Sequence, residues 1–148
     1  MIRMNQRAYI KQLAEKYGVD KCKDVHTPVN ESEKLIKRDE GDVFVTKCPY
    51  HELVGALKRR NVHTTRHVLY AMGEVAKYCE RHGKQHWVAA KRVHKYLTTT
   101  VDYSIVFNGK SKGELLGYAD NSWGNDLDSC RSRTGYVFLF NSSVISRK

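Results

Sequence analysis

Three aspartates stand close together in the last third of the chain, where carboxylates could hold a divalent metal ion. Asp120 lies where a predicted strand ends, and Asp126 and Asp128 follow it shortly afterwards. Several carboxylates are usually needed for phosphoryl chemistry, because two metal ions then sit about 4 Å apart. By spacing alone, an aspartate at the end of a strand is more often a turn or cap residue. The residues themselves therefore leave both interpretations of Asp120 open.

Two basic clusters could contact the phosphates of a nucleic acid. They are Lys58, Arg59 and Arg60 at the end of one predicted helix, and Lys91, Arg92 and Lys95 on the outer side of another. Contacts from lysine and arginine to phosphates give affinity without sequence choice. Trp87 lies close to the second cluster in the sequence. The alternative is a solvated helix face with no partner.

Histidines and cysteines occur at spacings that could be written as zinc ligands. His63 and His67 stand four residues apart, which can place two imidazoles on one face of a helix, but no glutamate stands in HExxH register. A second set would be Cys79, His82 and His86. Gly83 is expected to break the helix within that set, so we predict scattered histidines and no zinc site. The chain also contains no GxSxG elbow, no P-loop and no GxGxxG loop.

The elements that must position these residues are helical in the first two thirds of the chain and β in the last third. Apolar residues at helical spacing predict helices over 6–17, from 50 onward, from a cap at Thr64 or Thr65 to Gly83, and over 85–97. Residues 19–48 show no helical period, and we expect an extended linker there, with short strand-like pieces such as 43–45. Alternating residues predict strands over 101–107, 115–121, 134–140 and 143–147, the last two joined by an Asn141-Ser142 hairpin turn.

Composition favours a basic protein with a polyanionic partner. The 148 residues include 26 Lys and Arg against 16 Asp and Glu, which gives a net charge of +10. This length fits one domain or two incomplete ones. We find no apolar run near the roughly 20 residues that span a bilayer, and no signal peptide. The four spread cysteines indicate reduced thiols, so we expect an intracellular protein, cytoplasmic or nuclear, with no membrane partner.

The motifs together resemble copia-type retrotransposon Pol polyproteins. Residues 86–107, HWVAAKRVHKYLTTTVDYSIVF, resemble that family's HW-x-AAKR-x-x-(R/K)YL-x-x-T-x-DY segment. Residues 115–138, LLGYADNSWGNDLDSCRSRTGYVF, resemble its LxGYxDADWAGDxDxRRSTSGYVF. Shorter pieces upstream, including Thr27-Pro28 and Tyr50 with Leu53-Val54-Gly55, match in the right order. The resemblance covers nearly the whole chain.

The resemblance implies a particular slice of Pol with an α+β fold. Residues 1–100 would be a helical region like the reverse-transcriptase thumb and connection, and residues 101–148 would be the first strands, a three-stranded meander, of an incomplete ribonuclease H-like domain. Asp120 matches the first metal-binding aspartate of the ribonuclease H site. The parent enzyme would use Mg²⁺ to cut the RNA strand of RNA–DNA hybrids by two-metal hydrolysis. We expect the polymerase aspartates upstream of residue 1 and the other ribonuclease H carboxylates beyond Lys148, so no tight metal binding and no activity by this chain alone.

Departures from the family pattern suggest a degenerate copy. The chain has Leu57-Lys58-Arg59-Arg60 where the family has LMYL, which would cost stability if those charges were buried. It also has TTRHVLYA at 64–71 in place of TRPDIAYA. Two alternatives therefore remain beside the Pol fragment with the rest of Pol as its partner. One is a non-enzymatic basic module that binds nucleic acid, and the other is a non-functional pseudogene product.

Overall fold

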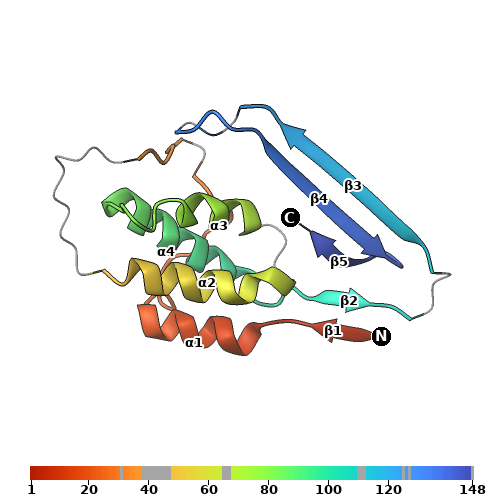
Figure 1. Cartoon of the computed structure of the whole chain (residues 1–148). Helices are drawn as coiled ribbons and strands as arrows, with labels where there is room; N and C mark the ends of the chain where they lie inside the picture. The colour runs from red at the N-terminus through yellow and green to blue at the C-terminus, as the bar shows by residue number, and fades with distance from the viewer. Residues whose placement is uncertain are drawn as a thin grey trace. The chain divides into compact units, whose positions relative to one another are not determined.

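A computed structural model describes residues 1–30, 32–37, 48–64, 68–109, 113–124, 126 and 128–147, without the side chains of 60–64. In chain order the elements are β1 (Ile2–Met4), α1 (Arg7–Tyr17), α2 (Tyr50–Thr64), α3 (Leu69–Ala76), α4 (Lys84–Thr99), β2 (Ile105–Phe107), β3 (Leu115–Ser122), β4 (Arg133–Phe140) and β5 (Ser143–Arg147). They form two compact units (Figure 1). The helical unit is Asn5–Tyr103, and the strand unit combines Met1–Met4 with Ser104–Lys148.

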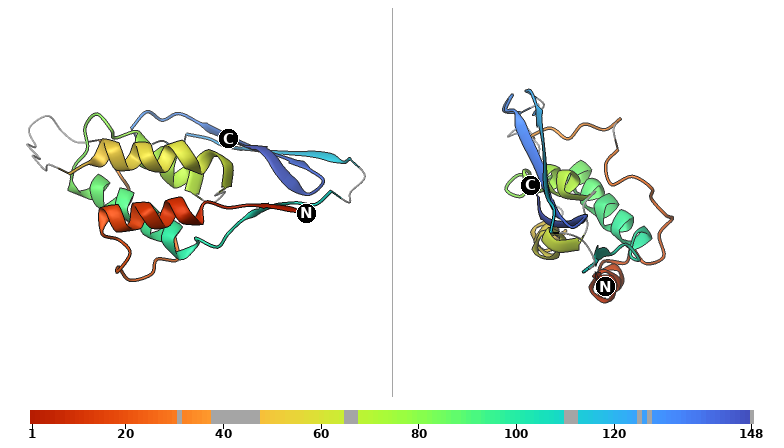
Figure 2. Two further views of the ribbon diagram at one scale, coloured as in Figure 1. Left: turned by 90° about the horizontal axis from the view of Figure 1, so that it is seen from below. Right: turned by 90° about the vertical axis from the view of Figure 1, so that its right-hand side faces the viewer.

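The helical unit is built around α4, which packs against α1, α2 and α3 (Figures 1 and 2). Each helix contributes an apolar stripe, as the sequence pattern predicts. The most deeply buried side chains include Tyr50, Leu53, Leu57, Val68, Val75, Val93 and Leu97. Burying an aliphatic side chain of this kind contributes about 2 kcal/mol, so these stripes supply the main drive for the helices to associate. No described helix is both long enough and apolar enough to cross a membrane.

The first helix agrees with its prediction. α1 ends at Tyr17, and Gly18 follows with φ of 64°, a left-handed conformation that glycine adopts without steric cost. The Gly18 N–H donates to the Glu15 carbonyl, and the Val19 N–H donates to the Ala14 carbonyl. These two bonds satisfy carbonyls that the helix end would otherwise leave unpaired. A glycine directly after an amphipathic stripe was therefore a sufficient signal for this boundary.

The predicted end of the next helix at Gly83 is wrong. α3 ends at Ala76, where the N–H groups of Tyr78 and Cys79 bond to carbonyls only three residues back and tighten the last turn. Gly83 instead precedes the first residue of α4. Thr64 is the last residue of α2 rather than the cap of α3, and Thr65 lies outside the described residues. The error arose because a glycine punctuates the start of a helix as well as its end.

The predicted linker is neither helix nor strand where the structure describes it. We use the term strap for residues 25–30 and 32–37 of this linker. The strap lies along α4 and forms hydrogen bonds with it. Val29 and Leu35 of the strap pack against the core. The strand-like piece predicted at 43–45 lies outside the described residues.

The strand unit contains two small antiparallel sheets. β1 pairs with β2, so residues 1–4 join the last third of the chain instead of the helical region assigned to 1–100. β2 is shorter than the predicted 101–107 strand, because α4 runs to Thr99 and the Tyr103 N–H closes a turn on the Thr100 carbonyl. The second sheet is a meander of order β3-β4-β5.

Local sequence explains the register of the meander. Asn141 and Ser142 have φ of 49° and 62°, as a two-residue hairpin turn of the primed type requires, and they connect β4 to β5 as predicted. The Asn141 side-chain oxygen accepts the backbone N–H groups of Gly113 and Glu114. Gly117 pairs with Phe138 across the sheet, and a Cβ at position 117 would lie 2.8 Å from Cε1 of that ring. Gly117 is therefore the residue that allows the Phe138 ring to lie against the strand.

Candidate nucleic-acid interface

The second basic cluster lies on the outer side of α4, as predicted. α4 directs Ala90, Val93, His94 and Leu97 into the core, which leaves Lys91 and Lys95 partly exposed on another face. The Lys91 ammonium lies 5.4 Å from the centre of the Trp87 ring, close enough for a cation–π contact. Trp87, Lys91 and Lys95 follow one another at four-residue intervals, so they share a face of the helix. We call these three residues the α4 ridge.

Arg92 does not belong to a free phosphate-binding surface. Its Nε–H donates to the Thr27 carbonyl over 3.1 Å, and its Nη2–H donates to Thr27 Oγ1 over 2.8 Å. The fork of the guanidinium thus holds the strap onto α4. Sequence spacing could not reveal this contact, because Thr27 stands 65 residues away from Arg92.

The first basic cluster lies on another helix. Lys58 and Arg59 are exposed on α2, and the side chain of Arg60 is outside the described residues. The stability cost expected for buried charges therefore does not arise at Lys58 or Arg59. The prediction that this cluster ends a helix is wrong, because α2 continues to Thr64. Burial raises the pKa of the Cys79 thiol, and the charge of Lys58 partly opposes that rise.

Asp120 stands on β3 in the strand unit, exposed and opposite Gly135. It is thus in a different unit from the basic residues. No group of three His, Cys, Asp or Glu in the described part of the chain could hold a metal ion. The donor set that a two-metal site would need is not assembled by these residues.

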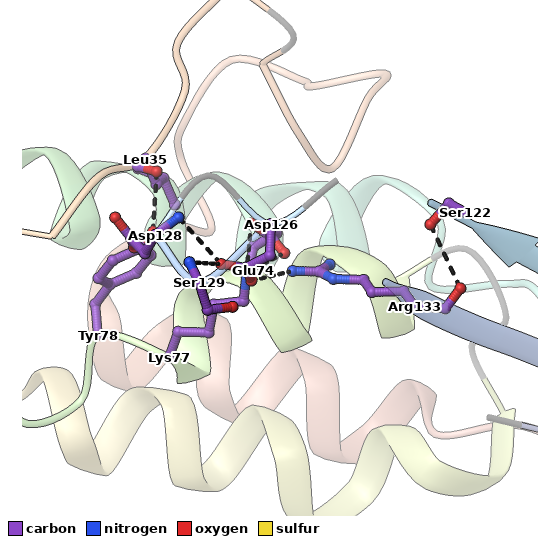
Figure 3. Close-up of polar contacts among 9 residues, drawn as sticks. All are labelled: Leu35, Glu74, Lys77, Tyr78, Ser122, Asp126, Asp128, Ser129 and Arg133. Atoms are coloured by element: carbon purple, nitrogen blue, oxygen red, sulfur yellow. Dashed lines mark hydrogen bonds and ion pairs between the residues drawn. The ribbon is translucent and has the colours of Figure 1, made fainter. Parts of the chain in front are cut away.

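Asp126 has a structural role that its spacing did not predict. The residue is 8% exposed, and its Oδ1 accepts the N–H groups of Asp128 and Ser129 over 3.1 and 3.0 Å (Figure 3). Its Oδ2 accepts a hydrogen bond from Arg133 over 3.3 Å. Both carboxylate oxygens therefore organise the loop between β3 and β4. Asp126 is consequently ill placed to complete a metal site with Asp120.

The histidines predicted to be scattered have ordinary structural contacts where they are described. The His82 Nδ1–H donates to the Cys79 carbonyl over 3.4 Å, and the ring stacks on Tyr50 at 4.5 Å. His86 is fully buried, and both of its ring nitrogens form hydrogen bonds, one with the Gly83 N–H and one with the Ile36 carbonyl. His67 and the side chain of His63 lie outside the described residues. The described cysteines, Cys22, Cys48, Cys79 and Cys130, are free thiols.

Sequence reasoning named Thr27, His86 and Asp126 but missed the contacts that they make. Each acts through backbone or side-chain partners that the fold supplies. The Asp126-x-Asp128-Ser129 spacing carried a detectable signal, because an aspartate often accepts the N–H two residues ahead of it. No comparable local pattern marked Thr27 or His86.

Comparisons with known proteins place the chain among mobile-element polyproteins. It is 33% identical over 150 residues to the retrovirus-related Pol polyprotein from transposon TNT 1-94 of Nicotiana tabacum, a match covering 97% of this chain and 11% of that protein. It is 29% identical over 145 residues to the Pol polyprotein from transposon RE2 of Arabidopsis thaliana, covering 98% of this chain and 10% of that protein. A shorter match, 35% identical over 98 residues, covers 66% of this chain and 69% of secreted RxLR effector protein 161 of Plasmopara viticola.

The tobacco and Arabidopsis relatives are both retrovirus-related Pol polyproteins of transposons. The chain belongs to the copia-type Pol polyprotein family. It spans about a tenth of the length of the Pol polyproteins it matches. No family model matches the chain, and no solved structure does.

Proposed function

We propose that this segment of Pol binds nucleic acid, with an RNA–DNA hybrid as its natural ligand, through the α4 ridge. The observation that carries the proposal is the partly exposed face on which Lys91 and Lys95 stand four residues apart beside Trp87, whose ring also packs partly against the core. Two lysines at this spacing suit adjacent phosphates of a backbone, and such contacts do not depend on base sequence. The net charge of +10 supplies a long-range attraction toward the same ligand.

The proposal assigns the helical unit to the region that follows the polymerase palm, and the strand unit to the start of a ribonuclease H-like domain. Support for the second assignment comes from the antiparallel meander β3-β4-β5, with Asp120 on its first strand. The rest of Pol is then the protein partner, and the segment works inside the cell, in the cytoplasm or nucleus, and is not secreted.

Metal-dependent cleavage requires more carboxylate ligands than Asp120 and Asp126 provide. Mg²⁺ in the parent enzyme would supply the two-metal chemistry of RNA hydrolysis. Here Asp120 stands exposed on β3 while the carboxylate of Asp126 is occupied by the β3–β4 loop. We therefore propose that the chain alone binds hybrid without cutting it. Binding without cleavage is also what the alternative of a non-enzymatic basic module predicts. A non-functional pseudogene product would neither bind the hybrid nor cut it.

Reversal of the ridge charges tests the proposal. The double variant Lys91→Glu/Lys95→Glu is expected to bind a labelled RNA–DNA hybrid about 30-fold more weakly at moderate salt, because two phosphate contacts become repulsive. Fluorescence anisotropy titrations at several salt concentrations measure this. The slope of log affinity against log salt should also become shallower by about 1.5, since each lost contact removes about 0.7 to 0.9.

Lys11→Glu/Lys23→Glu is the matched control. Both side chains are exposed on parts of the helical unit other than α4. The control changes the net charge by the same amount as the ridge variant. Its affinity should stay within about threefold of the unsubstituted chain, because it loses only the long-range attraction. Equal weakening by the two double variants would contradict an interface on the α4 ridge.

A further inference from the structure

The strap is attached to α4 along one line of the helix. Gln85, Arg92 and Thr99 stand seven residues apart, which places them on one face of a helix. Gln85 donates to the Ile36 carbonyl, Arg92 donates to Thr27, and Thr99 Oγ1 accepts the Val25 N–H over 3.4 Å. The strap therefore runs antiparallel to α4, with Arg92 at the middle of the line.

Arg92 is also the neighbour of Lys91 and lies three residues before Lys95, beside the α4 ridge. A guanidinium offers a planar fork of donors that suits a phosphate as well as it suits the hydroxyl and carbonyl oxygens of one threonine. The two N–H groups that Thr27 occupies, Nε and Nη2, are the pair that would form a bidentate phosphate contact. Thr27 and a phosphate thus require the same donors.

We infer that the strap is an autoinhibitory latch on the nucleic-acid interface: Thr27 occupies Arg92, and a phosphate of the bound nucleic acid displaces it. The inference rests on the proposed function. Both Arg92 bonds to Thr27 are exposed to solvent, so each contributes little net stability and can open. Val29 and Leu35 remain packed against the core and keep the released residues close to α4.

The variant Thr27→Val tests the latch in the full chain. Valine keeps the shape of threonine and removes the Oγ1 acceptor, so only the carbonyl still holds Arg92. The latch predicts that Thr27→Val binds the labelled hybrid about threefold more tightly, which is the equivalent of one modest hydrogen bond. In an Arg92→Gln background the same change should have no effect, because no guanidinium is left to release.

Amide hydrogen exchange gives a second readout. Saturating hybrid should speed exchange at Val25, whose N–H bonds to Thr99, while amides within α4 stay protected. Unchanged affinity in Thr27→Val, or the same gain in both backgrounds, would overturn the latch. If Lys91→Glu/Lys95→Glu still weakens binding in that case, only the latch has failed. If the ridge variant also binds normally, the proposed interface itself has failed.

Discussion

Replacing His86 with alanine should lower the free energy of unfolding by about 3 kcal/mol, because the buried ring has three separate partners. Its Nδ1 accepts the Gly83 N–H over 2.8 Å, at the start of α4. Its Nε2–H donates to the Ile36 carbonyl over 3.1 Å, which fixes the tautomer, and the ring stacks on Tyr78 at 4.2 Å. Alanine would leave a buried N–H unpaired and a cavity beside Tyr78. Urea unfolding followed by far-ultraviolet circular dichroism measures the change.

Gln85→Ala is the matched control for His86→Ala. Gln85 donates to the same Ile36 carbonyl over 3.3 Å, but from an exposed side chain. Its loss should cost no more than about 0.5 kcal/mol, since water replaces the amide. Similar destabilisation by both variants would show that the Ile36 contact, rather than the packing and capping by His86, supports α4.

Acid should destabilise the helical unit through His94. The His94 ring is fully buried against α1, and neither of its nitrogens has a well-formed hydrogen bond within the described part of the chain. The edge of Tyr17 lies against it, with ring centres 6.0 Å apart. Burial lowers the pKa of His94 to about 4, against a smaller opposing effect from the Ile10 backbone. Below about pH 6.5 the unfolded chain therefore takes up a proton that the folded chain refuses.

The direction of the pH dependence and the pH range in which it occurs follow from the difference between the folded and unfolded pKa of His94. The contribution of His94 to stability is complete above its unfolded pKa and is lost as the pH falls toward 4. Between neutral pH and about pH 4.5 the loss should be about 2 kcal/mol. His94→Leu should remove this dependence and raise stability at neutral pH, because the orphaned ring nitrogens disappear.

His94→Gln separates titration from polarity at this position. Glutamine cannot titrate, so its unfolding free energy should also lose the acid dependence assigned to the ring. It keeps buried polar atoms, so it should not gain stability at neutral pH. Urea unfolding at both pH values compares the three proteins. A wild-type chain whose stability falls with acid no more than that of His94→Leu would contradict the buried, neutral ring.

Features set by neighbouring residues were predictable from the sequence. The apolar stripe of α1 followed by Gly18, and the Asn141-Ser142 turn, each carry their signal within a few residues. Helical spacing on α4 likewise placed Lys91 and Lys95 outside and His94 inside, as observed. The resemblance to copia-type Pol, spread over nearly the whole chain, was confirmed by the relatives.

The roles of Gly83, Arg92 and Asp126 were not predicted. Gly83 could punctuate either neighbouring helix, and its role depends on the His86 ring that accepts its N–H. Arg92 has the sequence signature of a phosphate ligand, but the strap reaches it from 65 residues away. Asp126 was placed beside Asp120 as a possible ligand, whereas its carboxylate holds the loop and Arg133. Only the partner of Arg92 is distant in the sequence. The partners of Gly83 and Asp126 lie within seven residues, and each of these residues was misassigned because its local sequence fits two structural roles.

Incubation of the chain and of Asp120→Asn with an end-labelled RNA–DNA hybrid and Mg²⁺ measures both binding and RNA cleavage. We expect both proteins to bind the hybrid, added salt to weaken this binding, and the RNA strand to stay intact. Absence of binding even at low salt would contradict the nucleic-acid interface. Cleavage that disappears in Asp120→Asn would instead show that the chain assembles a working ribonuclease site.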